Sequence, residues 1–255
     1  MMNHIAVILR GHHRTWNLIC DYTLSSYEKL AKNVDYYVVS WDIPYTSTKH
    51  VTDTFTGRNL IKYVRVPIID TYYNSYYSSC WLPYNILPWK RQREKTVKYD
   101  AVIDSRPDIA VKVLKNKTII KPEENCLYTT GIELHDNICT SKKDIAVSDW
   151  FFISTSKVYN IMAERFIFPD RSGTQITQRL YAEKEDISVC TLDYVRTFIA
   201  RPNILNLELN DETFRDIGVK SREWTNLTRD ERRQYAKAAN VREEDYSTLS
   251  LHAAI

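Results

Sequence analysis

The sequence predicts an α/β protein with a mostly parallel, Rossmann-like sheet that is flanked by helices and followed by a helical C-terminal tail. Residues 5–9 form a short, continuous apolar run, which is typical of a strand covered on both faces. A glycine-containing loop follows at 10–14, and apolar side chains then recur at helical spacing over residues 16–32. Strand, loop and helix in this order make half of a βαβ unit, and the alternation continues along the first half of the chain.

The remaining elements follow from the same patterns. We expect further strands at residues 35–41, 60–66, 99–104, 118–120, 126–129, 146–154 and 187–192, and helices at 89–98, 157–166 and 173–180. After Pro202 the chain becomes more polar, and Thr228 and Glu231 form a capping box that opens a helix. We therefore predict one domain over residues 1–202 and a helical extension over 203–255, which either packs back on the domain or serves partners.

Composition indicates an ordered globular protein. The 255 residues are 44% hydrophobic and 26% charged, with five glycines and no biased tract. The apolar run near the start is far shorter than the roughly 20 residues that span a bilayer. Five widely spaced cysteines without a CxxC pair predict neither a disulfide framework nor a zinc site. We expect a cytoplasmic protein, and its net charge of +3 permits anionic partners without requiring them.

Polar residues that directly follow buried strands are the first candidates for a functional site. In open α/β sheets, ligands bind outside the carboxyl ends of the strands, near the point where the strand order reverses. Four places qualify in this sequence: residues 10–14, Trp41 with Asp42, residues 104–108, and Asp149.

The segment from Asp104 to Asp108 carries the most information. Two carboxylates and the guanidinium of Arg106 stand within five residues after a buried strand, where charge is costly unless it is paired or liganded. Carboxylates can hold a divalent metal, and a guanidinium can neutralise a departing nucleoside diphosphate. The alternative is a structural ion pair between Arg106 and Asp108 at a turn shaped by Pro107, and the spacing alone favours neither.

The loop from Arg10 to Arg14 places cations and backbone N–H groups between a strand end and a helix start, which suits a diphosphate. Gly11 allows the backbone to approach a ligand closely, although a lone glycine is a weak motif. His12 and His13 are residue types that bind metals, but adjacent side chains project differently. A solvated or hydrogen-bonded histidine pair is therefore the alternative.

Two further carboxylates are candidates. Asp149 lies among large apolar side chains, a setting that raises the pKa of a carboxyl group towards that of a general base, and a turn aspartate is the alternative. Asp42 with Trp41 suits a nucleoside, or is a loop aspartate after a core tryptophan. Residues 72–89 are rich in Tyr and Trp and resemble surfaces that stack on sugars or bases.

Four segments together resemble a group of viral, phage and bacterial glycosyltransferase-like proteins of the GT-A type. They are residues 5–14, 36–42, 99–109 and 148–154, and the resemblance covers roughly residues 4–202. It implies a domain that binds a nucleotide sugar, a UDP-sugar first, and transfers the sugar to an acceptor. If the protein comes from a virus or phage, the cytoplasm in which we expect it is that of the host cell.

The resemblance also implies roles for individual residues. On the nucleotide side it places Arg10, Gly11, His12, Arg14 and Asp42. Asp104 and Asp108 would hold Mn²⁺ or Mg²⁺ at the diphosphate, and Arg106 would offset the charge of the leaving group. Asp149 would orient or deprotonate the acceptor hydroxyl.

The acceptor and two rival functions remain open at this point. A glycan is one acceptor, and a hydroxymethylated base in phage DNA is the other, which the mildly basic charge and the arginines near the C-terminus would suit. A nucleotidyltransferase would share the sheet and the carboxylates but would consume a nucleoside triphosphate. A non-catalytic sugar or nucleic-acid binding module would need only the aromatic segment.

Overall fold

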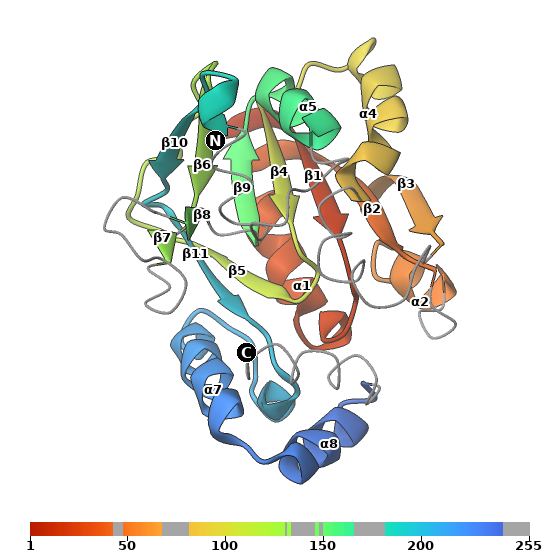
Figure 1. The fold of residues 1–255 in the computed structure, drawn as a ribbon, viewed down its shortest axis with the longest axis vertical. Coiled ribbons are helices and arrows are strands. Elements are labelled where there is room, and N and C mark those ends of the chain that lie inside the picture. The colour runs from red at the N-terminus through yellow and green to blue at the C-terminus, as the bar shows by residue number, and fades with distance from the viewer. Residues whose placement is uncertain are drawn as a thin grey trace.

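A seven-stranded, mostly parallel sheet forms the centre of the molecule (Figure 1). The computed structural model describes residues 1–42, 48–67, 82–130, 132–133, 146–147, 150–165 and 182–241. The strand order is β10-β6-β9-β4-β1-β2-β3. The strands of this sheet are β1 (Met2–Arg10), β2 (Ala31–Trp41), β3 (Asn59–Val66), β4 (Ala101–Ser105), β6 (Cys126–Thr129), β9 (Phe151–Ser154) and β10 (Ser188–Thr191).

Most neighbouring strands in this sheet run in parallel. β1 pairs in parallel with β2 and with β4, β2 with β3, and β10 with β6, whereas β9 is antiparallel to both of its neighbours. The predicted α/β class with a mostly parallel sheet and flanking helices is therefore confirmed. Two small antiparallel pairs stand beside the sheet: β5 (Ile109–Val113) with β11 (Val195–Ile199), and β7 (Ile132–Glu133) with β8 (Ala146–Val147).

Helices cover both faces of the sheet. They are α1 (Trp16–Glu28), α2 (Thr48–Asp53), α4 (Leu87–Glu94), α5 (Ser156–Arg165), α7 (Phe214–Asn226) and α8 (Arg229–Ala238), with the short 3₁₀ turns η2 (Leu82–Ile86) and η3 (Pro202–Ile204). Leu24 of α1 packs with Val7 of β1 on one face. On the other face, Ile86 of η2 and Tyr159 of α5 pack with Ile8 of β1. Among the described helices, none has the length and apolarity needed to cross a bilayer.

The strand order reverses at β1. The chain adds β2 and then β3 on one side of β1, crosses over, and adds β4 on the other side. The carboxyl ends of β1 and β4 therefore flank the topological switch point, the place where open α/β sheets bind ligands.

Some predicted elements differ from the observed ones. Residues 118–120 form no strand, because Ile119 packs on the core while Ile120 is 54% exposed, so the apolar run is not buried in a ladder. The stretch 146–154 is divided between β8 and β9. β5, β11 and α7 were not predicted, and the expected helix at 173–180 lies outside the described residues.

The C-terminal extension, as far as it is described, packs back on the domain. Ile217 of α7 lies in one apolar cluster with Ile19 of α1 and Ala110 of β5. The predicted capping box is present at the start of α8: Thr228 Oγ1 accepts from the Glu231 N–H, and Glu231 Oε2 accepts from the Thr228 N–H. The described part of the extension therefore packs against the domain, and its use for partners stays a prediction.

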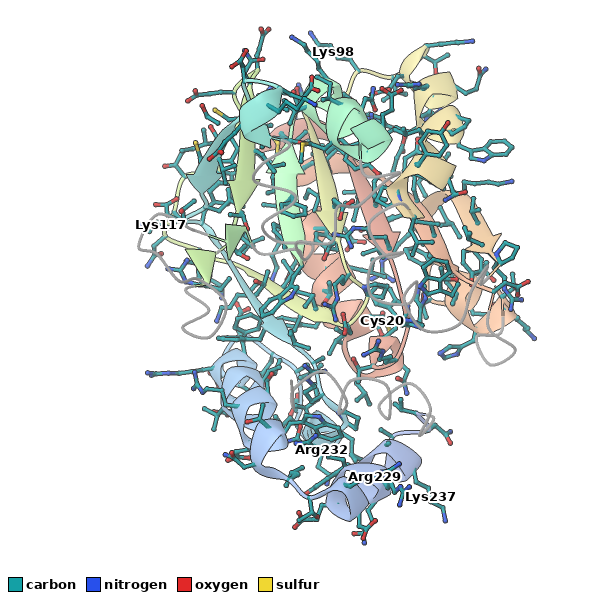
Figure 2. The ribbon with its side chains drawn as sticks, in the orientation of Figure 1. Cys20, Lys98, Lys117, Arg229, Arg232 and Lys237 are labelled. Atoms are coloured by element: carbon teal, nitrogen blue, oxygen red, sulfur yellow. The ribbon has the colours of Figure 1, made fainter. Side chains whose placement is uncertain are left out.

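The basic residues of α8 are partly engaged within the extension. Arg232 donates to the carbonyl oxygens of Trp224 at 3.1 Å and of Thr225 at 2.7 Å, and so satisfies the last turn of α7. Figure 2 shows Arg229, Arg232 and Lys237 together on this helix. The guanidinium of Arg232 therefore has a structural use, which reduces the basic surface that a nucleic acid would meet.

The docking of α7 gives a test of the fold. A Cβ atom on Gly218 would stand 2.6 Å from Cε1 of Phe198, whose ring is held against Phe214 with the ring centroids 5.1 Å apart. Gly218→Ala is expected to lower the free energy of unfolding by roughly 1–2 kcal/mol, despite the better helix propensity of alanine, because the ring must shift. Val219→Ala, at the next and 39% exposed position, should change it by less than about 0.5 kcal/mol. Equal values for the two variants in urea unfolding would contradict this packing.

Candidate switch-point site

The ends of β1 and β4 are joined by a buried ion pair across the switch point. Arg10 Nε donates to Asp104 Oδ1 at 2.5 Å, and the two side chains are 2% and 7% exposed. Side chains alternate along a strand, so both residues lie on the face of Ile8 and Val102, which η2, α4 and α5 cover. A charge at this depth is tolerable only with its partner, so each of the two side chains depends on the other.

A second ion pair forms in the turn after β4. Arg106 donates to both oxygens of Asp108, from Nε at 2.9 Å and from the terminal guanidinium nitrogen at 2.6 Å. The side chain of Asp108 is 4% exposed and that of Arg106 is 22% exposed. The turn is fixed from both sides, because the Arg106 N–H donates to the Trp150 carbonyl and its carbonyl accepts from Ile109. This is the pair that the structural alternative for the segment predicts.

Two more guanidinium groups act on Asp108. Arg14 at the start of the first helix and Arg201 after β11 both lower its pKa. The backbone around Arg201 is tied to the same turn, since the Ala200 N–H donates to the Asp108 carbonyl at 2.7 Å and the Ala200 carbonyl accepts from Thr15 Oγ1 at 3.2 Å. Sequence reasoning missed Arg201 and Thr15, although Arg201 follows a strand end and would have qualified had β11 been predicted.

The pKa of Asp108 shows which charge dominates. Burial alone would raise the pKa of this carboxyl group, but Arg106, with Arg14 and Arg201, outweighs burial and lowers the pKa to about 2. Burial and Arg14 also lower the pKa of His12 to about 3, so that this histidine is neutral at pH 7. Among the described residues, the guanidinium groups of Arg14, Arg106 and Arg201 thus form a cluster around Asp108.

A second part of the site lies at the ends of β2 and β3 and is largely neutral. His13 lies edge-on to Trp16 and Tyr63, with ring centroids 6.0 and 6.4 Å apart. Burial and the nearby His50 lower the pKa of His13 to about 3, and neither of its ring nitrogens has a hydrogen-bond partner in the part of the chain that the structure describes. Asp42 does not pair with the arginines of the switch point but with Arg65 of β3, at 2.6 Å.

Gly11 has a defined structural role. Its φ of +116° lies in the region that favours glycine. Its N–H donates to the Val39 carbonyl at 3.0 Å, which extends the pairing of β1 and β2 by one residue. The sequence had led us to expect that backbone N–H groups of this loop would face a diphosphate. The N–H of Gly11 does not, because it is used in the sheet.

The predicted metal role does not fit the residues as arranged. Both oxygens of Asp108 accept from Arg106, and one oxygen of Asp104 accepts from Arg10, so guanidinium groups stand where a cation would. In the described part of the chain, no group of three or more His, Cys, Asp or Glu side chains is arranged to hold a metal ion. We assign no chemical step to a metal here, and the metal role of Asp104 and Asp108 stays a prediction. Asp149, the predicted base, lies outside the described residues.

No protein-family model matches the chain, and no curated protein matches its sequence. The structure is similar to the glycosyltransferase GlyE of Streptococcus pneumoniae, with a TM-score of 0.41 and 12% identity over 76% of this chain and 46% of GlyE. The chain thus spans less than half the length of GlyE. It is also similar to the galactosyltransferase LgtC (TM-score 0.39, 11% identity, 84% of this chain and 82% of LgtC). A third similar structure is a nucleoside-diphosphate-sugar pyrophosphorylase from Vibrio cholerae (TM-score 0.41, 9% identity, 75% of this chain and 93% of the pyrophosphorylase).

The low pKa of Asp108 predicts a pH dependence of stability. The native pKa is about 2 and the ordinary value is 3.8, so the fold favours the ionised form by roughly 2 kcal/mol. Because the native pKa is depressed, this stabilisation is present above about pH 5 and is lost as the pH falls towards 2. Urea unfolding should show the free energy of unfolding falling more steeply from pH 5 to 2 in the wild type than in Asp108→Asn. Parallel curves would contradict the assignment.

Proposed function

We propose that this chain is a glycosyltransferase that moves a sugar from a nucleotide-sugar donor to an acceptor hydroxyl. The observation that supports this most directly is the gathering of three guanidinium groups, those of Arg14, Arg106 and Arg201, around Asp108 at the carboxyl end of β4. Arg14 and Arg201 come from segments far apart in sequence. A diphosphate is a ligand that several guanidinium groups gathered in one place complement.

The two parts of the site match the two parts of a nucleotide. The positive cluster at β1 and β4 suits the diphosphate, and the neutral, aromatic surroundings of His13 at β2 and β3 suit a nucleoside. Together with the resemblance of the four sequence segments, this division favours a nucleotide-sugar donor, and a UDP-sugar is the donor we expect.

The chemistry assigned to the cluster is stabilisation of the leaving group. The bond between the anomeric carbon and the diphosphate oxygen breaks, and its electron pair stays on that oxygen. We assign to Arg106, the more exposed member of its ion pair, the neutralisation of the charge that develops there. The acceptor oxygen bonds to the anomeric carbon and its proton passes to a base, for which Asp149 remains the proposed residue.

The acceptor hydroxyl belongs in our proposal to a glycan, and the sequence-based alternative is a hydroxymethylated base in DNA. Binding to duplex DNA that weakens steeply with salt would select DNA. Indifference to DNA would select the glycan.

Donor binding is the first test. UDP-glucose, UDP-galactose, UDP-N-acetylglucosamine and GDP-mannose are added in turn, with EDTA and with Mn²⁺, and the melting temperature is recorded. At least one should raise it, since a ligand that binds only the folded state stabilises that state. We expect the shift to persist in EDTA, because guanidinium groups hold the diphosphate. A shift confined to Mn²⁺ would return Asp104 and Asp108 to a metal role, and shifts with nucleoside triphosphates alone would favour a nucleotidyltransferase.

Arg106→Lys tests the guanidinium itself. Lysine keeps a positive charge beside Asp108 but loses the planar fork, so the fold should be retained while the affinity for the nucleoside diphosphate falls roughly tenfold or more. Arg222→Lys, at an exposed position of α7, is the matched control and should bind like the wild type. Isothermal titration calorimetry gives both affinities, and an unchanged value for Arg106→Lys would remove Arg106 from the site.

A further inference from the structure

Among the described residues, the hydroxyl group of Tyr159 on α5 is buried and has no hydrogen-bond partner, and the residue is 4% exposed. Two other buried tyrosines on the same face of the sheet are paired: Tyr37 with Tyr99 at 2.9 Å, and Tyr99 with Asp35 at 2.7 Å. An unpaired buried hydroxyl costs free energy, so the hydroxyl of Tyr159 is available to a partner that arrives from outside the protein.

The surroundings of Tyr159 place its hydroxyl beside the first ion pair of the site. Its ring packs with Ile8 and Val102, which precede Arg10 and Asp104 by two residues on the same face of β1 and β4. Asp104 is the charged group that acts most strongly on the hydroxyl, and Arg10 follows. Burial first and then Asp104 raise the pKa of Tyr159 far above its ordinary value, so the hydroxyl is a donor at any pH at which the fold is stable.

Lys90 of α4 holds this tyrosine in place through contacts with its ring and with the neighbouring residues of α5. Its ammonium group, 0% exposed, donates to Ser156 Oγ at 2.5 Å and to Asn160 Oδ1 at 3.0 Å, on either side of Tyr159 in the first turn of α5. The same nitrogen lies 5.2 Å from the centroid of the Tyr159 ring. An ion pair of Lys90 with Glu94 at 2.7 Å compensates its charge. The ring is therefore fixed before any ligand binds.

We propose that Tyr159 determines sugar specificity by donating a hydrogen bond to a hydroxyl of the donor's sugar, which in turn donates to Asp104. A sugar hydroxyl both accepts and donates, so it matches a phenol donor and a carboxylate acceptor that lie close together. A phosphate oxygen fits less well, because it can only accept and Asp104 would repel it. Arg10 balances the charge of Asp104 throughout. The inference rests on the proposed function and adds the residue that reads the sugar.

Tyr159→Phe tests this, with Tyr99→Phe as the matched control. Both variants lose one buried oxygen, but only Tyr99 loses hydrogen-bond partners in the protein. We expect Tyr159→Phe to melt at or above the wild-type temperature and Tyr99→Phe to melt several degrees lower. Calorimetry then compares the best-binding nucleotide sugar of the screen with its nucleoside diphosphate. Tyr159→Phe should bind the nucleotide sugar roughly tenfold more weakly and the nucleoside diphosphate as tightly as the wild type. Tyr99→Phe should bind both unchanged.

The outcomes separate the two proposals. If the wild type binds no nucleotide sugar, the proposed function fails, whatever the variants do. If the wild type binds and Tyr159→Phe binds the nucleotide sugar equally well, the hydroxyl does not contact the donor and this inference is overturned. An equal loss for nucleotide sugar and nucleoside diphosphate would place the contact on the phosphates and overturn the sugar assignment.

Discussion

The buried pair of Arg10 and Asp104 is the interaction on which the candidate site depends. It joins the last residue of β1 to β4 on the covered face of the sheet, at the one place where the chain has crossed from one side of β1 to the other. Two charges at this depth are stable only together, so the pair fixes the relative position of the two strand ends more strictly than apolar contacts could. The turn that carries Arg106 and Asp108 begins directly after β4 and inherits this position.

Asp108 lies close to more than one guanidinium group. Arg106 already supplies both hydrogen bonds that Asp108 accepts from a side chain, yet Arg14 and Arg201 also bring their charge to bear on this carboxyl group. Like charges that gather at the carboxyl end of a sheet repel one another unless anions balance them. A diphosphate is the anion that the proposed function assigns to this place. The low pKa of the neighbouring His12 is another effect of burial in this positive field.

The sequence predicted the local features of this protein and missed the ones that depend on distant segments. The apolar runs of β1 to β4 identify covered strands because a parallel sheet buries both faces, and the polar residues after them follow from that. β11 was missed because residue 196 is exposed and residues 197–199 are only partly buried, and the strand with which β5 pairs lies more than 80 residues later in the chain. Arg201 was missed with them. That Arg10 pairs with Asp104 could not be deduced, since no pattern in either segment encodes the strand order.

Tyr159 illustrates a proposed site residue that no sequence motif could identify. In the sequence it is one apolar position of an amphipathic helix, and its ring does pack in the core as such a position should. Its hydroxyl becomes informative only when its surroundings are known: phenylalanine would fill the same space without leaving a polar atom unpaired. Lys90 has the same character, because a lysine in a polar helix is expected in solvent, and this one is buried with Ser156 and Asn160 as partners. Lys90 has hydrogen-bond partners and Tyr159 has none among the described residues, and in our proposal Lys90 holds the tyrosine in place for a ligand.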